Sequence, residues 1–424
     1  MSSKLSKIKE RYRQIPFLVW SLLLANIIFN TFRFMSMPFM AIYFSEKLNL
    51  TPAEVGVLIG ISPLSSLVFS VVGGRIADRF GIHKVYPIAL LIPAASLIGY
   101  IVFENYLVIA LFSVLAGIGW TVYNSTSNSI LALHTPKAHT EVVFGYNYWV
   151  INLGGVIGPL LGVLVIEMGS YETPIVLFSI ILVALAGSMI GLFRVKKADI
   201  SAHYIEAEKE LAGSTSIFTL LTKDRVLIWL MLSYFFIFFI EAQVDTNIAQ
   251  YLNGSFEDGV RLFGLLVAMM TGLIVVLQPI ITHVFSRFSN VRSFVFGNSL
   301  YFLGFLILLF LNNFTYAWFI SFAFITIGEM IVAPRMQAVM AKSAPTNLKA
   351  TYFSLIGAGG NFAYAIGPGI GGLLLTNLSI NYLFLFLLFI VFAQFFALVQ
   401  ANKSYNLKIS DSSSPPTING IKKS

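Results

Sequence analysis

Five ionisable side chains lie inside stretches of the sequence that are otherwise apolar, namely Arg33, Glu241, Asp245, Glu329 and Arg335. A charge at the centre of a bilayer costs at least ~2.5 kcal/mol on insertion scales, so such residues normally face a protein interior and have a task. Glu241 and Asp245 are four residues apart and share one helix face, where the charge of one carboxylate makes the other hold its proton. This pattern favours a site that takes up and releases protons.

Glu329 is the acid that lies deepest in its apolar stretch. Burial favours the neutral form of a carboxyl group, so we predict that Glu329 carries protons, with Glu241 and Asp245 as further proton-coupling residues. Arginine stays charged throughout, so Arg33 and Arg335 are predicted counter-charges and not carriers. Two alternatives stay open: a structural salt bridge between Glu329 and an arginine, and an interfacial position in water for Asp245.

Neutral polar and aromatic side chains accompany these charges. Asn26, Asn30 and Arg33 fall at helical spacing on one face. The polar run over 123–128 is expected to face a cavity, although serine and threonine can instead bond their own backbone. An apolar pocket with a few polar groups suits lipophilic ligands. The residues predicted to line such a pocket are Asn26, Asn30, Arg33, Tyr123, Asn124, Asn128, Asn147, Tyr148, Asn152, Asn361, Tyr364 and Arg335.

The composition indicates which elements must position these side chains. Hydrophobic residues make up 57% of the 424 residues and charged residues 11%, against about 25% charged residues in an ordinary soluble domain. Most of the surface must therefore face lipid. The chain has no cysteine, which excludes disulfides, thiolate metal sites and thiol catalysis. The histidines have no ligand spacing and no catalytic set is convincing, so we expect no metal, no cofactor and no enzyme.

Charges and turn residues divide the chain into about twelve apolar segments, each near the length that a spanning helix needs. A strand barrel is disfavoured, because the apolar runs are continuous and not alternating. We therefore predict an all-α integral membrane protein. The predicted spans are 16–44, 52–77, 85–103, 106–133, 142–167, 173–193, 226–251, 260–284, 292–312, 315–341, 350–376 and 381–401.

Lysine and arginine are distributed unevenly between the two sides of these spans. With the N-terminus inside, only Lys47 and Arg261 of the 27 basic residues fall in outer loops. The positive-inside rule then places both termini in the cytoplasm, and it accounts for the net charge of +8 without a nucleic-acid partner. The predicted organisation is an N-terminal segment over 1–15, a six-helix half over 16–193, a linker over 194–225, a six-helix half over 226–401 and a disordered tail over 402–424.

The two halves repeat at an offset of 209 residues. Six coincidences share this register, and they include Asn152 with Asn361, the Gly-Pro pairs at 158 and 367, and Gly162 with Gly371. Duplicated six-helix halves are typical of secondary transporters, which bind their substrates between the halves near the middle of the membrane.

The loop after the second predicted span reads GRIADRFGIHK over 74–84. It resembles the signature loop of the major facilitator superfamily, in which a glycine, an Asp-Arg pair and a second glycine precede a basic cluster. Ile82 and His83 depart from this pattern, because they stand where the family usually has basic residues. The resemblance implies that the loop gates the cytoplasmic side through Gly74, Asp78, Arg79 and Gly81.

The fifth predicted span carries small residues at helical spacing. The series Gly145, Gly154, Gly158, Pro159 and Gly162 resembles the motif of the drug:proton antiporters of that superfamily. Small residues let helices approach closely and proline lets a helix bend, so ordinary packing is the alternative. An arginine usual in the fourth span of those antiporters is missing here, where Ser113 stands instead. The second half repeats the packing series at Gly367, Pro368 and Gly371.

On these motifs the chain is identified as a member of the major facilitator superfamily, most like its multidrug efflux branch. The resemblance implies proton-coupled export of lipophilic or drug-like small molecules by alternating access, from a monomer in the cell membrane. No phosphate-binding glycine loop is present, so ATP is not the expected energy source. The alternatives are a symporter for a sugar, peptide or other metabolite, and an exporter of an endogenous product such as a siderophore or lipid. A membrane receptor is a weaker alternative, because twelve spans with an internal repeat are excessive for one.

Overall fold

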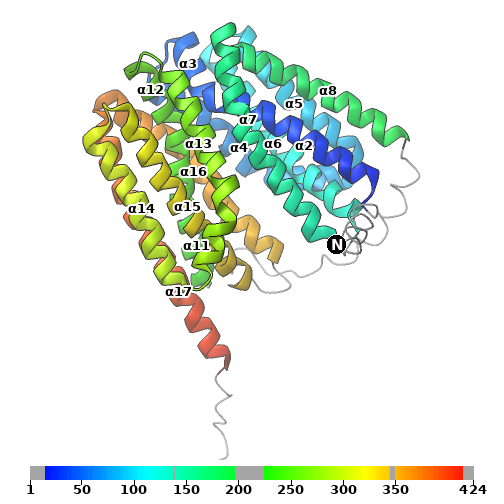
Figure 1. Ribbon diagram of the computed structural model, residues 1–424. Coiled ribbons are helices and arrows are strands. Elements are labelled where there is room, and N and C mark those ends of the chain that lie inside the picture. Colours follow the sequence, from blue (N-terminus) through cyan, green and yellow to red (C-terminus); the bar gives the residue numbers. More distant parts are fainter. Residues whose placement is uncertain (1–14, 137–138, 196–223, 344–348, 414–424) are drawn as a thin grey trace, which may run out of the picture.

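A computed structural model describes residues 15–136, 139–195, 224–343 and 349–413 of the chain. Within these ranges every regular element is a helix, and the long helices lie side by side in one bundle (Figure 1). Eleven helical stretches in the described part are long and apolar enough to cross a membrane. The predicted all-α, multi-pass membrane fold is thereby confirmed.

The first half of the chain begins with an interrupted span, whose break lies at Pro38. Proline cannot donate its backbone nitrogen to the helix ladder, and a short 3-10 turn takes up the discontinuity there. The elements of this half are α2 (Phe17–Ser36), η1 (Met37–Phe39), α3 (Met40–Leu48), α4 (Pro52–Phe80), α5 (Ile82–Val102), α6 (Tyr106–His134), α7 (Thr140–Met168) and α8 (Thr173–Val195).

The second half also begins with an interrupted span, but here the break is a π-helix. The elements are α11 (Arg225–Gln243), η4 (Val244–Ile248), α12 (Ala249–Ser255), α13 (Gly259–Phe285), α14 (Asn290–Leu311), α15 (Thr315–Ser343), α16 (Lys349–Asn377) and α17 (Ile380–Ser413). With 29 residues, α16 is long enough to cross a bilayer as well. It corresponds to the predicted eleventh span over 350–376 and brings the number of candidate spans in the described part to twelve.

The helix α17 runs on as far as Ser413 and projects beyond the bundle (Figure 1). The tail that the sequence predicts from 402 onward is therefore helical in its first part, and its remainder over 414–424 lies outside the described residues. The N-terminal segment over 1–14 and most of the linker over 194–225 lie outside them too.

The internal repeat is visible in the helix boundaries. Moved forward by 209 residues, the bounds of α6 become those of α15, and the bounds of α7 become those of α16. The buried side chains follow the same division, because one apolar core fills the first half and two fill the second. Phe39, Ile42 and Val163 of the first half belong to a second-half core, so the halves also share packing.

The bundle has two ends, which we name by their connections. At the linker end α8 ends at Val195 and α11 begins at Arg225; the opposite, loop end holds the turn between α3 and α4. Asp224 caps the start of α11 by accepting the backbone N–H groups of Val226 and Leu227.

The halves touch each other at the loop end and in the middle of the bundle. Asn253 donates to Glu46 Oε1 at 2.6 Å and accepts from the Tyr171 hydroxyl at 3.5 Å. The Ala53 backbone N–H donates to Thr376 Oγ1 at 3.2 Å. In the middle, the Thr271 hydroxyl of α13 donates to the Gly155 carbonyl of α7 at 2.8 Å. Between described residues, no hydrogen bond joins the halves at the linker end.

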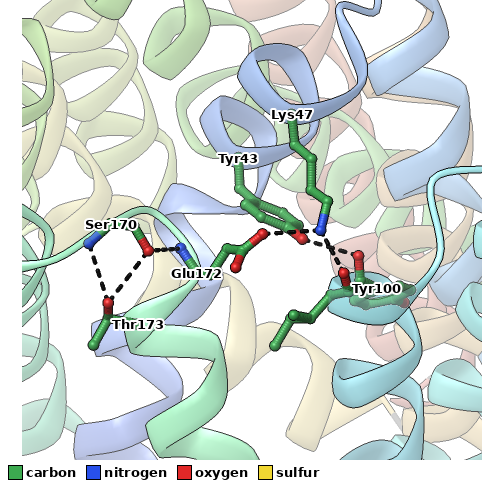
Figure 2. A network of polar contacts seen from close by, with 7 residues as sticks. Tyr43, Lys47, Tyr100, Ser170, Glu172 and Thr173 are labelled. Atoms are coloured by element: carbon green, nitrogen blue, oxygen red, sulfur yellow. Dashed lines mark hydrogen bonds and ion pairs between the residues drawn. The ribbon is translucent and has the colours of Figure 1, made fainter.

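An ion pair supports the loop end of the first half (Figure 2). The Lys47 ammonium lies 2.9 Å from Glu172 Oε1, donates to the Ile101 carbonyl and sits over the Tyr43 ring. The Tyr43 hydroxyl in turn donates to the Tyr100 carbonyl at 2.9 Å. These contacts join α3 to α5 and α8, and they hold the segment that carries Glu46 in place.

Candidate functional site: a carboxyl cluster in the second half

Three helices of the second half bring the predicted proton carriers together. The Tyr364 hydroxyl of α16 lies 3.0 Å from Asp245 Oδ2 and 3.5 Å from Glu241 Oε2. Glu329 of α15 is close enough for its charge to act on Glu241, and Asp245 acts on Glu329 in the same way. The sequence predicted Glu241 and Asp245 as a pair on one helix face and Glu329 apart from them; in the structure Tyr364 bonds to the pair, and Glu329 lies near it. We call Glu241, Asp245, Glu329 and Tyr364 the carboxyl cluster.

Local backbone geometry explains how these side chains meet. Asp245 lies in the π-helix η4, one of the elements that occur preferentially at functional sites because the extra residue re-aims neighbouring side chains. Glu329 follows Gly328, where a Cβ atom would lie 2.6 Å from the Gly297 carbonyl oxygen. The glycine thus allows α14 and α15 to approach closely at the depth of the acid.

One cation from the other half acts on the cluster. Arg33 of α2 is exposed, and its positive charge reaches Asp245 and Tyr364. Its guanidinium lies 5.6 Å from the centre of the Phe34 ring, and among the described residues it has no carboxylate within 4 Å, since the Lys47–Glu172 pair is the only ion pair found there. Arg33 therefore faces the cluster across the interface without being locked to one acid.

The structure places the second predicted counter-charge elsewhere. Arg335 lies on α15 with Glu329, but its guanidinium donates to the Phe285 carbonyl at the end of α13. A cation at a helix C-terminus satisfies free carbonyl groups and interacts favourably with the helix dipole. Arg335 is thus a helix cap in the second half. Among the described residues no ion pair joins Arg335 to Glu329, and the place of Arg335 in a substrate pocket stays a prediction.

Three of the residues predicted to line a pocket form a buried network in the first half. Asn26 of α2 donates to Asn147 Oδ1 of α7 at 2.6 Å and accepts from the Tyr123 hydroxyl of α6 at 3.2 Å. Their exposed fractions are only 5%, 9% and 4%, respectively. Phe29 stacks on the Tyr123 ring at 4.3 Å between centroids. We call Asn26, Tyr123 and Asn147 the amide network; it joins three helices and is not open to a ligand in this conformation.

The other predicted lining residues fall into two groups. Asn30 is buried, donates to the Asn26 carbonyl and packs against Gly154, and Asn152 donates to the Tyr148 carbonyl at 2.8 Å. Asn30 thus serves packing within the first half, whereas Asn152 is partly exposed and stays a candidate for contact with a ligand. The remaining members are exposed polar or aromatic side chains, and they stay candidates for contact with a ligand: Asn124, Asn128, Tyr148 and Asn361.

The predicted glycine series does bring helices into close contact. A Cβ atom at Gly154, Gly158 or Gly162 would lie 2.5–2.8 Å from backbone atoms of α2. In the second half, the corresponding face of α16 meets α11, and Gly371 leaves no room for a Cβ beside the Gln243 side chain. Pro159 and Pro368 lie within α7 and α16, while Gly145 is outside the described side chains.

The predicted gating residues are only partly described. Gly74, Asp78 and Arg79 fall within α4, but their side chains lie outside the described part. Gly81 has φ 87° and makes the turn from α4 to α5, a backbone conformation that glycine adopts without steric cost.

Two amide side chains beside the cluster were missed at the sequence level. Gln243 donates to the Gly367 carbonyl at 2.8 Å, and Asn247 donates to Gln243 Oε1 at 2.8 Å and to the Pro368 carbonyl at 3.0 Å. Both are fully buried. Each amide lies two residues after an acid of the 241/245 pair. This position within an apolar span could have identified them, because buried amides in a spanning helix normally bond to a neighbouring helix. Among the described residues, no group of three or more potential metal ligands is found.

Comparison with known proteins identifies the family of the chain. The family model of the Major Facilitator Superfamily matches residues 22–352 and 244–416. The chain belongs to this superfamily of membrane transporters, and it is a transporter of small molecules, not an enzyme.

Relatives cover most of the chain. The uncharacterized MFS-type transporter YdeE of Escherichia coli (strain K12) is 27% identical over 88% of this chain and 92% of its own length. A Na(+), Li(+), K(+)/H(+) antiporter of Planococcus maritimus is 26% identical over 81% of this chain and 85% of its own. The quinolone resistance protein NorA of Staphylococcus aureus is 28% identical, but over only 32% of this chain and 35% of its own.

Solved structures share the fold. A bacterial homologue of the human lysosomal transporter Spinster, in an inward-facing and unoccupied conformation, superimposes with a TM-score of 0.72 at 15% identity, over 94% of this chain and 99% of its own. The nucleoside transporter NupG superimposes with a TM-score of 0.74 at 13% identity, over 91% of this chain and 99% of its own.

Proposed function

We propose that the protein is a secondary active transporter that exchanges protons for a lipophilic, cationic small molecule and exports it by alternating access. The observation that carries this proposal is the carboxyl cluster, in which Tyr364 joins Glu241 and Asp245 beside Glu329. Among the described residues, Arg33 is the one cation whose charge reaches the cluster, and it acts on Asp245, so the site with all three carboxyl groups ionised is anionic. Such a site holds either protons or a cationic substrate, and competition between the two is the basis of antiport.

Aromatic side chains around the cluster favour an organic cation. Phe238 lies between Tyr234 and Tyr364, with ring centroids 5.4 and 6.0 Å away. Aromatic faces attract cations by about 0.5–2 kcal/mol each, more where water is excluded. A delocalised cation with apolar groups would satisfy both the acids and the rings. The name of the relative NorA gives quinolone resistance, which is consistent with a drug-like substrate.

The contacts between the halves support alternating access. Among the described residues they hold the loop end together through Asn253, Glu46 and Thr376. In the proposed cycle, a substrate enters from the linker end and leaves by the loop end once those contacts open. The basic residues of the sequence assign the linker end to the cytoplasm, which makes the direction export from the cell. We expect the monomer to be the working unit, since the cluster lies within one chain.

A second candidate is exchange of a monovalent metal cation for protons. The antiporter of Planococcus maritimus favours it, because its name gives Na(+), Li(+) and K(+) as its cations. The same carboxyl cluster would serve, with oxygen atoms as ligands in place of aromatic contacts. Import of a sugar or a peptide is less compatible with an anionic site.

The test is a transport assay with purified protein in liposomes that carry an imposed pH gradient. The panel contains a lipophilic cation such as tetraphenylphosphonium, the chlorides of sodium, lithium and potassium, a sugar and a dipeptide. We expect the lipophilic cation to move against the proton gradient and to release protons into the opposite compartment. Movement of the sugar or dipeptide together with protons, and of no cation, would contradict the proposal.

Orientation is tested separately with single cysteines, since the chain has none of its own. In intact cells, a membrane-impermeant thiol reagent is expected to label Asn377→Cys at the loop end and to spare Lys403→Cys at the linker end. Both residues are exposed. The reverse labelling pattern would overturn the assignment of the linker end to the cytoplasm.

A further inference from the structure

The helix α16 is attached to α11 at three levels. At the linker end, the Tyr352 hydroxyl lies 2.7 Å from Asp224 Oδ2, which caps α11. In the middle, the Tyr364 hydroxyl of α16 bonds to the carboxyl groups of Glu241 and Asp245. Toward the loop end, the amides of Gln243 and Asn247 bond to the carbonyl groups of Gly367 and Pro368. We call this last contact the amide clasp.

The stretch of α16 that the clasp holds is also the stretch that touches the other half. A Cβ atom at Gly56 of α4 would collide with the Pro368 carbonyl, and one at Gly60 would collide with the Ala365 carbonyl. The Pro368 carbonyl oxygen thus lies between Asn247 on one side and α4 on the other. Tyr364 is a single residue before Ala365, so the clasp, the carboxyl cluster and the contact with α4 share about two turns of one helix.

The amide clasp is buried and tightly packed. Gln243 and Asn247 are fully buried, and Gly371 of α16 leaves no space for a side chain against Gln243 Oε1. Asn247 belongs to the π-helix η4, together with Asp245. A change in the π turn that moves Asp245 must therefore also move Asn247, and with it the Pro368 carbonyl.

We propose that Gln243 and Asn247 are positioning residues that transmit the protonation state of the carboxyl cluster to the contact between α16 and α4, and so to opening of the loop end. This inference rests on the proposed function. The amides do not touch protons or substrate themselves. They fix the register of α16 on α11, so that a rearrangement around Asp245 and Tyr364 becomes a displacement of the segment over 364–371 against α4.

A small number of titratable and charged groups lie around Asp245. Asp245 is faced by Glu241 on its own span, Glu329 on α15, Tyr364 on α16 and Arg33 on α2. Tyr234 and Tyr301 lie within reach of the charge of Glu241. Of these groups, the three carboxyls are the ones that exchange protons near neutral pH when they are partly buried.

The reporter of loop-end opening is a cysteine in place of Ile42. This residue of α3 is fully buried in a core of the second half, so it becomes accessible only when the loop end opens. The rate of its reaction with a maleimide is measured on purified protein in detergent at about pH 6 and about pH 8. Because a thiol reacts through its thiolate, each rate is divided by that of Asn377→Cys, an exposed position at the same end.

We expect the normalised rate of Ile42→Cys to differ at least about fivefold between the two pH values, the lower bound of common coupling between sites. In Gln243→Leu or Asn247→Leu, this pH effect falls to less than about twofold, while substrate still binds and its affinity keeps its dependence on pH. Gly371→Ala, which displaces Gln243 without removing an amide, flattens the effect in the same way. That variant keeps the test valid if a leucine variant fails to fold.

The matched control is Gln394→Leu. Gln394 is a fully buried glutamine of the second half, and among the described residues its amide has no hydrogen-bond partner. We expect this variant to keep the full pH effect, which separates the clasp from a general response to loss of a buried amide. An unchanged pH effect in Gln243→Leu, Asn247→Leu and Gly371→Ala overturns the inference and leaves proton coupling intact. The absence of any pH effect before substitution, together with substrate binding that ignores pH, overturns both the inference and the proposed function.

Discussion

The centre of the first half is a neutral, buried hydrogen-bond network, whereas the centre of the second half carries three carboxyl groups with partial exposure. Asn26, Tyr123 and Asn147 join α2, α6 and α7 and have no charge to change. The carboxyl cluster lies on α11 with η4, on α15 and on α16. By their order in the chain, these elements correspond to α2, α6 and α7 of the first half. The same helix arrangement thus holds a fixed network in one half and a titratable one in the other.

The 209-residue offset of the repeat shows that no residue of the amide network recurs in the second half. The positions 209 residues after Asn26, Tyr123 and Asn147 hold Phe235, Val332 and Ile356.

In the opposite direction, no acid of the cluster has an acid as its counterpart. The positions 209 residues before the cluster hold Phe32, Ser36, Trp120 and Gly155. Two halves that responded alike to a proton would move alike and leave their contact unchanged. Because the three acids of the carboxyl cluster all lie in the second half, their protonation changes that half against the first.

The largest expected effect is that of Glu329→Gln, which imitates the protonated acid permanently. Gradient-driven transport should fall to the level of liposomes without protein, because the deepest carboxyl group of the cluster can no longer exchange a proton. Substrate binding should persist. The measurement is uptake into proteoliposomes with and without a pH gradient, and Glu172→Gln at the loop end is the charge-matched control. Normal accumulation by Glu329→Gln would assign proton coupling to other residues.

The next effect concerns the one cation that the first half presents to the cluster. In Arg33→Gln, the carboxylates lose a favourable charge and hold their protons more tightly. The midpoint of substrate binding against pH should therefore move upward, by up to about one pH unit or ~1.4 kcal/mol. Arg33→Lys keeps the charge and should restore the midpoint. Equilibrium binding of tetraphenylphosphonium across pH measures the shift, and a midpoint that stays in place in Arg33→Gln would remove Arg33 from the site.

Substitution in the amide network should lower stability without affecting proton coupling. Asn147→Leu leaves the Asn26 amide unpaired in the interior, which costs about 1–3 kcal/mol. We expect a lower unfolding temperature in detergent, with an unchanged pH dependence of transport by the folded protein. Tyr123→Phe, which removes one bond to Asn26, should have a smaller effect of the same kind. A shifted pH profile in either variant would show that the first half takes part in the proton chemistry.

The smallest effect is expected at the ion pair of the loop end. The Glu172 side chain is 41% exposed, and exposed pairs contribute about 0–1 kcal/mol. Glu172→Gln should lower the unfolding temperature slightly at low salt and leave transport intact. Thermal unfolding at low and high ionic strength measures it, because screening should remove most of the difference. A large loss of transport would mean that this pair takes part in closing the loop end.

Much of the fold follows from the sequence for simple physical reasons. A spanning helix requires about 20 apolar residues, so the spans are marked by charges and turn residues, and the repeat aligns α6 with α15 and α7 with α16. The interruptions are harder to predict. Pro38 marks the 3-10 turn in the first span, but the π-helix at Val244–Ile248 has no residue that demands it, and its contact with α16 through Asn247 is not visible in the sequence.

The sequence predicted which residues belong to the candidate site, but not which residues contact each other there. Glu241, Asp245 and Glu329 were found because a charge in an apolar span is expensive, and that argument needs no structure. It does not say which helix each acid faces, so Tyr364 as the common partner of Glu241 and Asp245, and Phe285 as the partner of Arg335, could not be inferred. The sequence likewise does not show which of the predicted asparagines are buried. In the structure Asn26 and Asn147 are buried and pair with each other, whereas Asn361 is exposed.

The most direct test of the account is a count of the protons that purified protein releases into a weakly buffered detergent solution when tetraphenylphosphonium binds. We expect release by the unmodified protein and by Asn147→Leu, and no release by the triple variant Glu241→Gln, Asp245→Asn, Glu329→Gln. That result would place the exchanged protons on the second half alone. Proton release that survives in the triple variant, or that is lost in Asn147→Leu while substrate still binds, would contradict the assignment of proton coupling to the carboxyl cluster.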